Sequence, residues 1–302
     1  MVIIFGFYKF KKIKSLVRFK KLLNSEVNNK DIKGTIILSS EGINGTVAGK
    51  KKNIYKFQDL LKKILKFSKF DSSNKSNSNF QPFHRGKIKI KKEVVPLGFK
   101  INKKNKAKNN YYLGKSWNKL ILDKDTFVID TRKPFEHRVG TFKNAVNPNI
   151  KNFRDFPKFL KKIDKKRPVA MFCTGGIRCE KASAFLKKKG FSNVYQLKGG
   201  ILNYLKNTHK KDSLWKGECY VFDNRVSVKH GLKPGNLKIC AGCREPISSS
   251  EIKSNKYEEG VTCPNCFSLL SDDQKKRFRM RQQQIQIQKK LGKKYFYQRE
   301  FK

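Results

Sequence analysis

We predict an α/β protein built from three consecutive regions. Residues 1–98 are expected to form a small α+β domain, because apolar strands and amphipathic helices follow one another in the order βαββαβ. Residues 111–208 alternate buried strands with helices, which indicates a parallel sheet. Residues 209–302 contain two Cys-x2-Cys pairs, which indicate a small metal-stabilised region followed by a basic helix. Residues 99–110 are basic and rich in Asn, and are predicted to be a linker.

The first region has the element order of a ferredoxin-like fold. Its apolar patterns predict helices at 13–23 and 54–65, and strands at 2–7, 35–38, within 41–49 and at 87–95. The Gly and Asn-Gly turn signals around the third strand support its short length. Residues 67–79, rich in Ser, Asn and Lys, are predicted to form a loop.

The central region has buried strands at 126–129, 169–172 and 194–197, and a helix at 180–188 closed by Gly190. The first strand ends at Asp130, and the second leads directly into Cys173. Because the functional loops of a parallel sheet lie at the carboxyl ends of its strands, both residues are candidates for a site. In the last region, a polar helix is predicted at about 271–291.

The charge of the chain is strongly positive, with 71 Lys+Arg against 23 Asp+Glu and a formal charge of +48. Such an excess favours a polyanionic partner, and nucleic acid is the first candidate. An alternative is a nucleotide-composition bias of the genome, because Lys far outnumbers Arg and Asn, Ile and Phe are abundant. An anionic membrane surface is a weaker candidate, since no amphipathic anchor stands out.

The start of the chain does not resemble a signal peptide, because its apolar residues 1–5 precede the basic residues. No apolar run approaches the ~20 residues of a membrane span. The seven cysteines are odd in number, and the pattern favours metal binding and catalysis over a disulfide framework. These features predict a cytoplasmic protein, and no protein partner is evident.

The loop that begins at Cys173 has the composition of a reactive site. A cysteine between a buried strand and a helix N-terminus is exposed to unpaired N–H groups and a positive dipole end, both of which stabilise a thiolate. Gly175 and Gly176 let successive N–H groups turn inward as an anion nest, and Arg178 adds a permanent charge. The Cys-x4-Arg spacing is one residue shorter than the Cys-x5-Arg loop of tyrosine phosphatases, which suits a persulfide. The alternative is a structural cysteine beside a turn.

Several segments around this loop resemble a rhodanese domain: 128–132 with Glu136, 140–142 and Ala145, and 172–178 with 198–201. The resemblance implies that the nest comprises Thr174, Gly175, Gly176 and Ile177, and that Asp130 orders the loop opposite the active site. It also implies that Arg132 and Glu136 support the domain. Those two could equally form ordinary surface ion pairs.

The whole chain is similar to the bacterial tRNA uridine hydroxylase family. The similarity rests on the loop 173–181 and on the segments 41–46, 92–98 and 219–223, all in the order found in that family. It implies oxygen-dependent 5-hydroxylation of the wobble uridine, position 34 of tRNA, with molecular oxygen as co-substrate. It also implies that Cys173 is the catalytic persulfide-forming residue, assisted by Arg178 and by Cys179, the second cysteine of the motif. Cys179 could instead be a packing residue.

The group that would activate oxygen is not indicated by the sequence. There is no flavin or nicotinamide Gly-rich fingerprint after the first strand. The four histidines are scattered, and nothing groups them as an iron triad: His84, His137, His209 and His230.

The last region carries a candidate zinc site formed by Cys240, Cys243, Cys263 and Cys266. Two Cys-x2-Cys knuckles at this separation can converge on one tetrahedral ion, and four thiolates close its shell, so the zinc would be structural. The alternatives are four reduced cysteines in a vestigial site, or a redox pair.

A tRNA substrate requires a basic face that follows phosphates, and its anticodon loop can present an unstacked base. The candidate RNA contacts are the N-terminal domain, the basic segment 100–108, and Arg277, Arg279 and Arg281 on the last helix. Each could also be a solvated face. Two other functions remain open: a sulfurtransferase that uses a Cys173 persulfide, and a non-catalytic RNA-binding module with a relic site.

Overall fold

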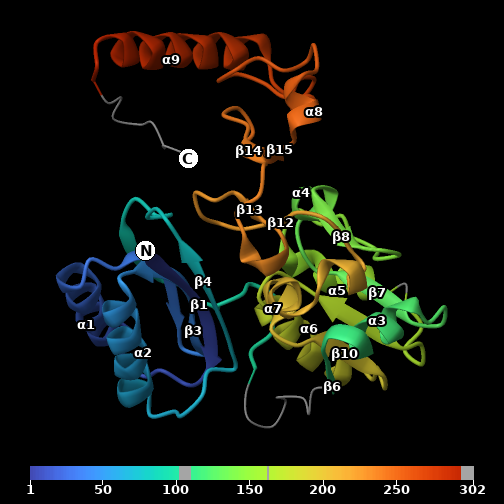
Figure 1. Ribbon diagram of the computed structural model, residues 1–302. Coiled ribbons are helices and arrows are strands. Elements are labelled where there is room, and N and C mark those ends of the chain that lie inside the picture. Colours follow the sequence, from blue (N-terminus) through green and yellow to red (C-terminus); the bar gives the residue numbers. More distant parts are fainter. Residues whose placement is uncertain (102–109, 162, 294–302) are drawn as a thin grey trace.

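The computed structural model describes residues 1–101, 110–161 and 163–293. An N-terminal α+β domain lies beside a central α/β domain, and the C-terminal region extends away from both (Figure 1). This arrangement confirms the predicted fold class.

The N-terminal domain is a five-stranded sheet in the order β4-β1-β3-β2-β5. Its elements are β1 (Val2–Phe10), α1 (Leu16–Asn29), β2 (Lys33–Ser39), β3 (Gly42–Gly49), α2 (Lys51–Leu65), β4 (Ser72–Ser78) and β5 (Gly86–Ile90). Both helices pack on one face, where Phe5, Phe7, Leu23 and Phe57 share a buried cluster. The first four strands and two helices have the predicted ferredoxin-like order, and β5 adds a parallel edge strand beside β2.

Two details of the N-terminal prediction are wrong. Residues 67–79, predicted as a loop, contain β4, which pairs antiparallel with β1. The strand predicted at 87–95 ends at Ile90 and is the fifth strand. The loop prediction fails because β4 is an edge strand of Ser, Asn and Lys without apolar alternation. Its strand conformation therefore depends on pairing with β1.

The central domain contains a four-stranded parallel sheet in the order β6-β10-β9-β7. Its elements are β6 (Asn110–Tyr112), α3 (Gly114–Leu122), β7 (Phe127–Asp130), α4 (Pro134–Arg138), β8 (Gly140–Phe142), η1 (Phe153–Asp155), α5 (Phe156–Leu160), β9 (Val169–Phe172), α6 (Ile177–Lys188), β10 (Val194–Leu197) and α7 (Gly200–Asn207). Separate buried clusters cover the two faces, one around Trp117 and Phe172 and the other around Met171 and Leu186. The strands predicted at 169–172 and 194–197 are confirmed at both ends.

The chain after α7 returns to the central domain before it leaves it. The returning elements are η2 (Lys210–Asp212), β11 (Trp215–Gly217), β12 (Cys219–Tyr220), β13 (Ser227–Val228) and η3 (His230–Leu232). β11 pairs with β8, and Trp215, Cys219 and Leu232 belong to the core around Trp117. Packing therefore ties this segment to the central sheet.

The remaining elements are β14 (Lys238–Ile239), β15 (Pro246–Ile247), α8 (Ser249–Ile252) and α9 (Asp272–Lys290). α9 starts at a capping box in which Ser271 and Gln274 satisfy each other's backbone N–H groups. It has no buried residue, and none of the described helices is long and apolar enough to cross a membrane.

Candidate functional site

Cys173 lies between β9 and α6, at the carboxyl edge of the parallel sheet. Its side chain is buried, and the backbone N–H of Gly176 donates to its Sγ at 3.1 Å. Gly176 caps α6 with a φ of +96°, a conformation that L side chains rarely adopt. Gly200 is also required, because a Cβ there would lie 2.4 Å from the carbonyl oxygen of Cys173. The two glycines thus let the loop close around the sulfur.

The surroundings of Cys173 favour its thiolate. Burial alone would raise its pKa, but a hydrogen bond from the Cys179 thiol, the charge of Arg178 and the N–H groups at the start of α6 lower the pKa to about 6. The pKa of Cys179 is raised by its own burial and by the neighbouring Cys173. The first cysteine is therefore ionised at neutral pH while the second stays protonated.

Arg178 is held by a buried carboxylate. Its Nη1 and Nη2 donate to the two oxygens of Glu136 at 2.9 and 3.0 Å, and Thr174 Oγ1 donates to the same carboxylate at 3.3 Å. Burial would raise the pKa of Glu136, but Arg178 outweighs it and keeps the carboxyl ionised. This bidentate pair fixes the guanidinium beside the loop.

Asp130 and Arg132 form a second buried pair at the end of β7, next to the end of β9. Arg132 Nε and Nη2 donate to the Asp130 carboxylate at 2.9 and 2.6 Å, and its guanidinium lies over the ring of Trp215. Since Arg132 and Glu136 are both buried, the interpretation that they form surface ion pairs is wrong.

Cys179 is buried in the cluster that contains Ile129 and Met171, as a packing residue would be. Its Sγ also lies 3.5 Å from Thr131 Oγ1 and interacts with Cys173. The packing and the site interpretations of this cysteine are therefore compatible.

One group of site residues was not predicted from the sequence. Lys181 on α6 is fully buried, and its Nζ donates to Glu41 Oε1 at 2.8 Å, Glu93 Oε2 at 2.6 Å and the Val95 carbonyl at 2.7 Å. Glu41 and Glu93 come from the N-terminal part of the chain, so this ion cluster joins that part to the helix that carries the reactive loop. All three charged residues lie in the segments that carry the family resemblance, which was the available signal.

A cavity of about 460 Å³ lies between the N-terminal sheet and the Cys173 loop. One wall comes from β1, β3 and β4, and the other from residues 131–133, 150–153 and 173–178. Phe222, whose side chain is 63% exposed, also lines it. Because Cys173 is among the lining residues, a ligand in this cavity would lie next to the Cys173 loop.

The segment that contains Asp223 and Arg225, which follows the central domain, also contacts the N-terminal sheet. Arg225 pairs with Asp223 and donates from Nη1 to Ser76 Oγ of β4 at 3.0 Å. The cavity lining includes residues 44–46, 94–96, 173–175 and 222, so all four segments that carry the family resemblance meet around it, although they are far apart in the sequence.

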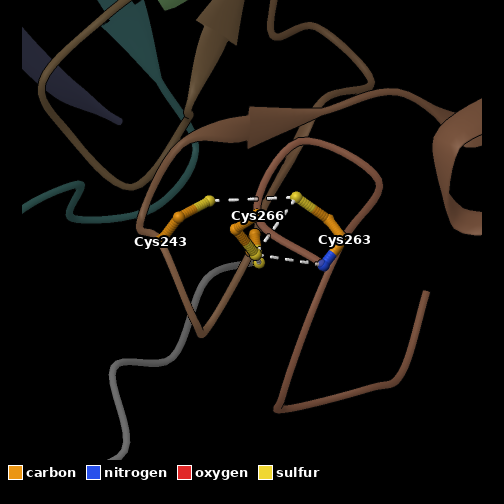
Figure 2. A group of neighbouring side chains, drawn as sticks. Cys243, Cys263 and Cys266 are labelled. Atoms are coloured by element: carbon orange, nitrogen blue, oxygen red, sulfur yellow. Dashed lines mark hydrogen bonds between the residues drawn. The ribbon is translucent and has the colours of Figure 1, made fainter. Parts of the chain in front are cut away.

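The four cysteines of the last region form one cluster, as predicted, with all four sulfurs within 4.8 Å of one another. Figure 2 shows Cys243, Cys263 and Cys266 turned toward each other. The sulfurs of Cys240 and Cys266 are 3.9 Å apart, those of Cys243 and Cys263 are 3.8 Å apart, and those of Cys263 and Cys266 are 3.8 Å apart. Four thiolates on a tetrahedral zinc with bonds of about 2.3 Å lie about 3.8 Å apart. The residues present therefore fit a closed zinc site.

The predicted RNA contacts on α9 have partners within the chain. Arg279 makes a bidentate pair with Glu258, and Arg281 donates to the carbonyl of Gly260 at 2.8 Å. Both attach the helix to the cysteine cluster region, whereas Arg277 is exposed. Most of the predicted contact segment 100–108 lies outside the described residues.

Comparisons with known proteins match this architecture. Residues 2–94 match the family described as UPF0176 acylphosphatase like domain, and residues 115–207 match the rhodanese-like domain. A protein of Pelagibacter ubique named tRNA uridine(34) hydroxylase is 62% identical over 299 residues, covering 99% of both chains. A protein of Rhizobium etli with the same name is 44% identical over 287 residues, covering 93% of both. A solved rhodanese-related protein of Thermoplasma volcanium is 26% identical, with a TM-score of 0.27, and covers 32% of this chain and 90% of that one.

Proposed function

Because the chain belongs to the tRNA uridine(34) hydroxylase family, we propose that it hydroxylates uridine 34 of tRNA at C5, with molecular oxygen as co-substrate. The observation that carries the proposal is the identity of 62% over almost the full length of a relative with that name. The anticodon loop is the part of tRNA that the enzyme must bind.

The residues of the Cys173 loop are proposed to act as one site. Cys173 is the catalytic residue that forms the persulfide: its thiolate attacks the outer sulfur of a sulfane donor such as thiosulfate, and sulfite leaves. Arg178 together with the N–H groups of Thr174, Gly175, Gly176 and Ile177 stabilises negative charge on its sulfur. Glu136 positions Arg178, and the Asp130–Arg132 pair supports the adjacent strand end. Cys179 supplies the hydrogen bond that keeps the sulfur ionised.

The four-cysteine cluster is proposed to hold one structural zinc. With four protein sulfurs as ligands, no coordination position is left for a substrate. The ion would fix the fold of the region that carries α9.

The test is nucleoside analysis of unmodified tRNA incubated with purified protein and a thiol reductant, under air and under nitrogen. We expect 5-hydroxyuridine at position 34 under air alone, and incorporation of one labelled atom from ¹⁸O₂. Cys173→Ser is expected to abolish the product, with Cys219→Ala as a cysteine control outside the loop. Absence of product with folded wild-type protein under air would contradict the proposal, and equal product under nitrogen would contradict its oxygen dependence.

A second candidate is sulfur transfer, which the lowered pKa and the anion nest of Cys173 favour. A thiosulfate–cyanide assay measures it directly. Thiocyanate production that depends on Cys173, in protein that makes no 5-hydroxyuridine, would establish sulfur transfer in place of hydroxylation. Phenotypes that survive Cys173→Ser but not charge reversal of the basic segment 100–108 would indicate a non-catalytic RNA-binding module.

A further inference from the structure

The face of the N-terminal sheet that α1 and α2 leave uncovered is polar. In β1, Phe5 and Phe7 point into the helix-covered core. Because successive side chains alternate between the two faces of a sheet, Gly6 and Tyr8 face the other side. The strand register places Ser72, Tyr8 and Asn44 in one row and Asn74, Gly6 and Thr46 in the next, across β4, β1 and β3. All six residues line the cavity that contains Cys173.

Most of this face is used to contact the central domain. Ser72 Oγ donates to the carbonyl of Gly175, and Asn74 Nδ2 to the carbonyl of Gly199, both at 3.3 Å. The Tyr8 hydroxyl lies against Gly176, where an added Cβ would be 3.3 Å from it. The β4 and β1 positions therefore hold the reactive loop in place.

The two β3 positions are different. The side chains of Asn44 and Thr46 are half-buried and make no hydrogen bond with any other residue that the structure describes. Both side chains line the cavity and are free of partners among the described residues, so a ligand can bind them in place of water. Gly6, in the same row as Thr46, has no side chain, so the space next to the Thr46 hydroxyl is open; a Cβ on Gly6 would lie in contact with Thr46 Oγ1, at 3.6 Å.

The shape and chemistry of the cavity fit a pyrimidine base. Its volume of about 460 Å³ is typical of small-ligand sites. An amide and a hydroxyl can both donate and accept, which matches the edge of uracil, where an N–H lies between two carbonyls. Phe222 offers the exposed aromatic surface on which unstacked bases are commonly held.

We infer that the extruded uracil of the substrate binds in this cavity, with Asn44 and Thr46 hydrogen-bonded to its edge and Phe222 against its ring. The inference rests on the proposed function and names the part of the protein that binds the reacting base. The N-terminal domain is then the base-binding wall, and the central domain supplies the sulfur on the opposite wall.

The first test compares KM and kcat of Asn44→Ala, Thr46→Val and wild type on an anticodon stem-loop. Loss of one neutral hydrogen bond to the base is expected to raise KM by roughly 2- to 12-fold for each variant. Gly6→Leu, which fills the space in front of Thr46, is expected to lose measurable activity. Asn77→Ala is the matched control, because Asn77 is exposed on β4 and outside the cavity. The ultraviolet titration of the Cys173 thiolate should be the same in all variants, which separates base binding from damage to the loop.

The second test is photocrosslinking of a stem-loop that carries 5-iodouridine at position 34. We expect crosslinks to Phe222 or to peptides of β1 and β3, and their loss in Gly6→Leu. Crosslinks confined to other surfaces, or unchanged KM in both β3 variants of an active enzyme, would overturn the inference and leave the proposed function intact. If wild type makes no 5-hydroxyuridine, the proposed function fails, and the crosslink still reports whether uracil enters this cavity.

Discussion

At the scale of single residues, the ionisation of Cys173 depends on groups that stabilise a buried charge. Desolvation opposes ionisation of the thiol, and the Cys179 hydrogen bond, Arg178 and the first N–H groups of α6 overcome it. The same charge could not be tolerated in the core without these partners. The loop therefore combines a protected sulfur with a reactive protonation state.

Titration of the Cys173 thiolate by its ultraviolet absorbance tests this balance. Because its pKa is lowered, the thiolate should form as the pH rises through about 6, well below the ~8.5 of an ordinary cysteine. Arg178→Met should move the midpoint upward, since it removes a positive charge that favours the ionised form. Subtraction of the Cys173→Ser titration isolates the signal, and an unperturbed midpoint in wild type would contradict the assignment.

The sequence identified Cys173 and Arg178 because the residues that shape their chemistry are neighbours in the chain. The partner of Arg178 was harder to predict from the sequence, because Glu136 is 42 residues away and was expected only to support the domain. The role of Lys181 was missed for the same reason, since its carboxylate partners are 140 and 88 residues away. A lysine in a helix gives no local sign that it is buried.

At the scale of elements, α6 is attached to the N-terminal domain through Lys181. One buried ammonium lies between the carboxylates of Glu41 and Glu93. Its removal leaves two neighbouring negative charges without their shared cation, and the backbone N–H groups that they also accept from do not replace its charge.

Lys181→Met should therefore lower the free energy of unfolding by about 3–5 kcal/mol, as expected when one partner of a buried ion cluster is removed. Denaturant titration measures the change, and Lys188→Met on the exposed side of the same helix is the control. A loss of less than about 1 kcal/mol would show that the cluster is not the main contact between the domains.

The cysteine cluster defines a second element-scale prediction. One zinc per chain should be found by elemental analysis, and its removal by a chelator should unfold the region around β14, β15 and α8 while the central sheet stays folded. Hydrogen exchange resolves the two regions. The double variant Cys240→Ser, Cys263→Ser should bind no zinc, and full zinc content in that variant would contradict the assignment.

Secondary-structure elements were predicted accurately where their residues are buried and apolar. The bounds of β9 are predictable because all four of its residues are apolar, and those of β10 because it begins and ends with buried Val194 and Leu197. The residues of β4 are polar and predict a loop. An edge strand whose conformation depends on its neighbour leaves little periodic signal in its own residues. The β4 residues Ser72 and Asn74, which hold the loop, were therefore outside the predicted site.

At the scale of the whole molecule, the charge of +48 predicts that RNA binding depends strongly on salt. Lys12, Lys14 and Arg18 are exposed beside a groove of the N-terminal domain that is lined by several more basic residues. Replacing these three by Ala should weaken tRNA binding and reduce the slope of log K against log salt by about 0.7–0.9 for each lost phosphate contact.

A filter-binding series at several salt concentrations provides the measurement. The control is a triple variant of exposed lysines in the central domain: Lys119, Lys124 and Lys166. Equal slopes for the two triple variants would mean that the loss of positive charge weakens RNA binding equally at both places, and that this groove makes no specific phosphate contacts.

The architecture of three regions could be predicted from the sequence, but the cavity between the first two could not. Its walls come from segments that no local pattern connects, and only the packing of β1, β3 and β4 against the Cys173 loop brings them together. The resemblance of four separate segments to one family was the only sign that they meet.

The wide separation of Lys181 from its partners also has a consequence for the order of biosynthesis. Glu41 and Glu93 leave the ribosome well before Lys181, and Phe222 follows later still. The N-terminal sheet can fold early, because its strands and helices contact one another within the first part of the chain. The nascent protein therefore holds one wall of the cavity before its cysteine exists, and Phe222 completes the lining only when translation has passed residue 222.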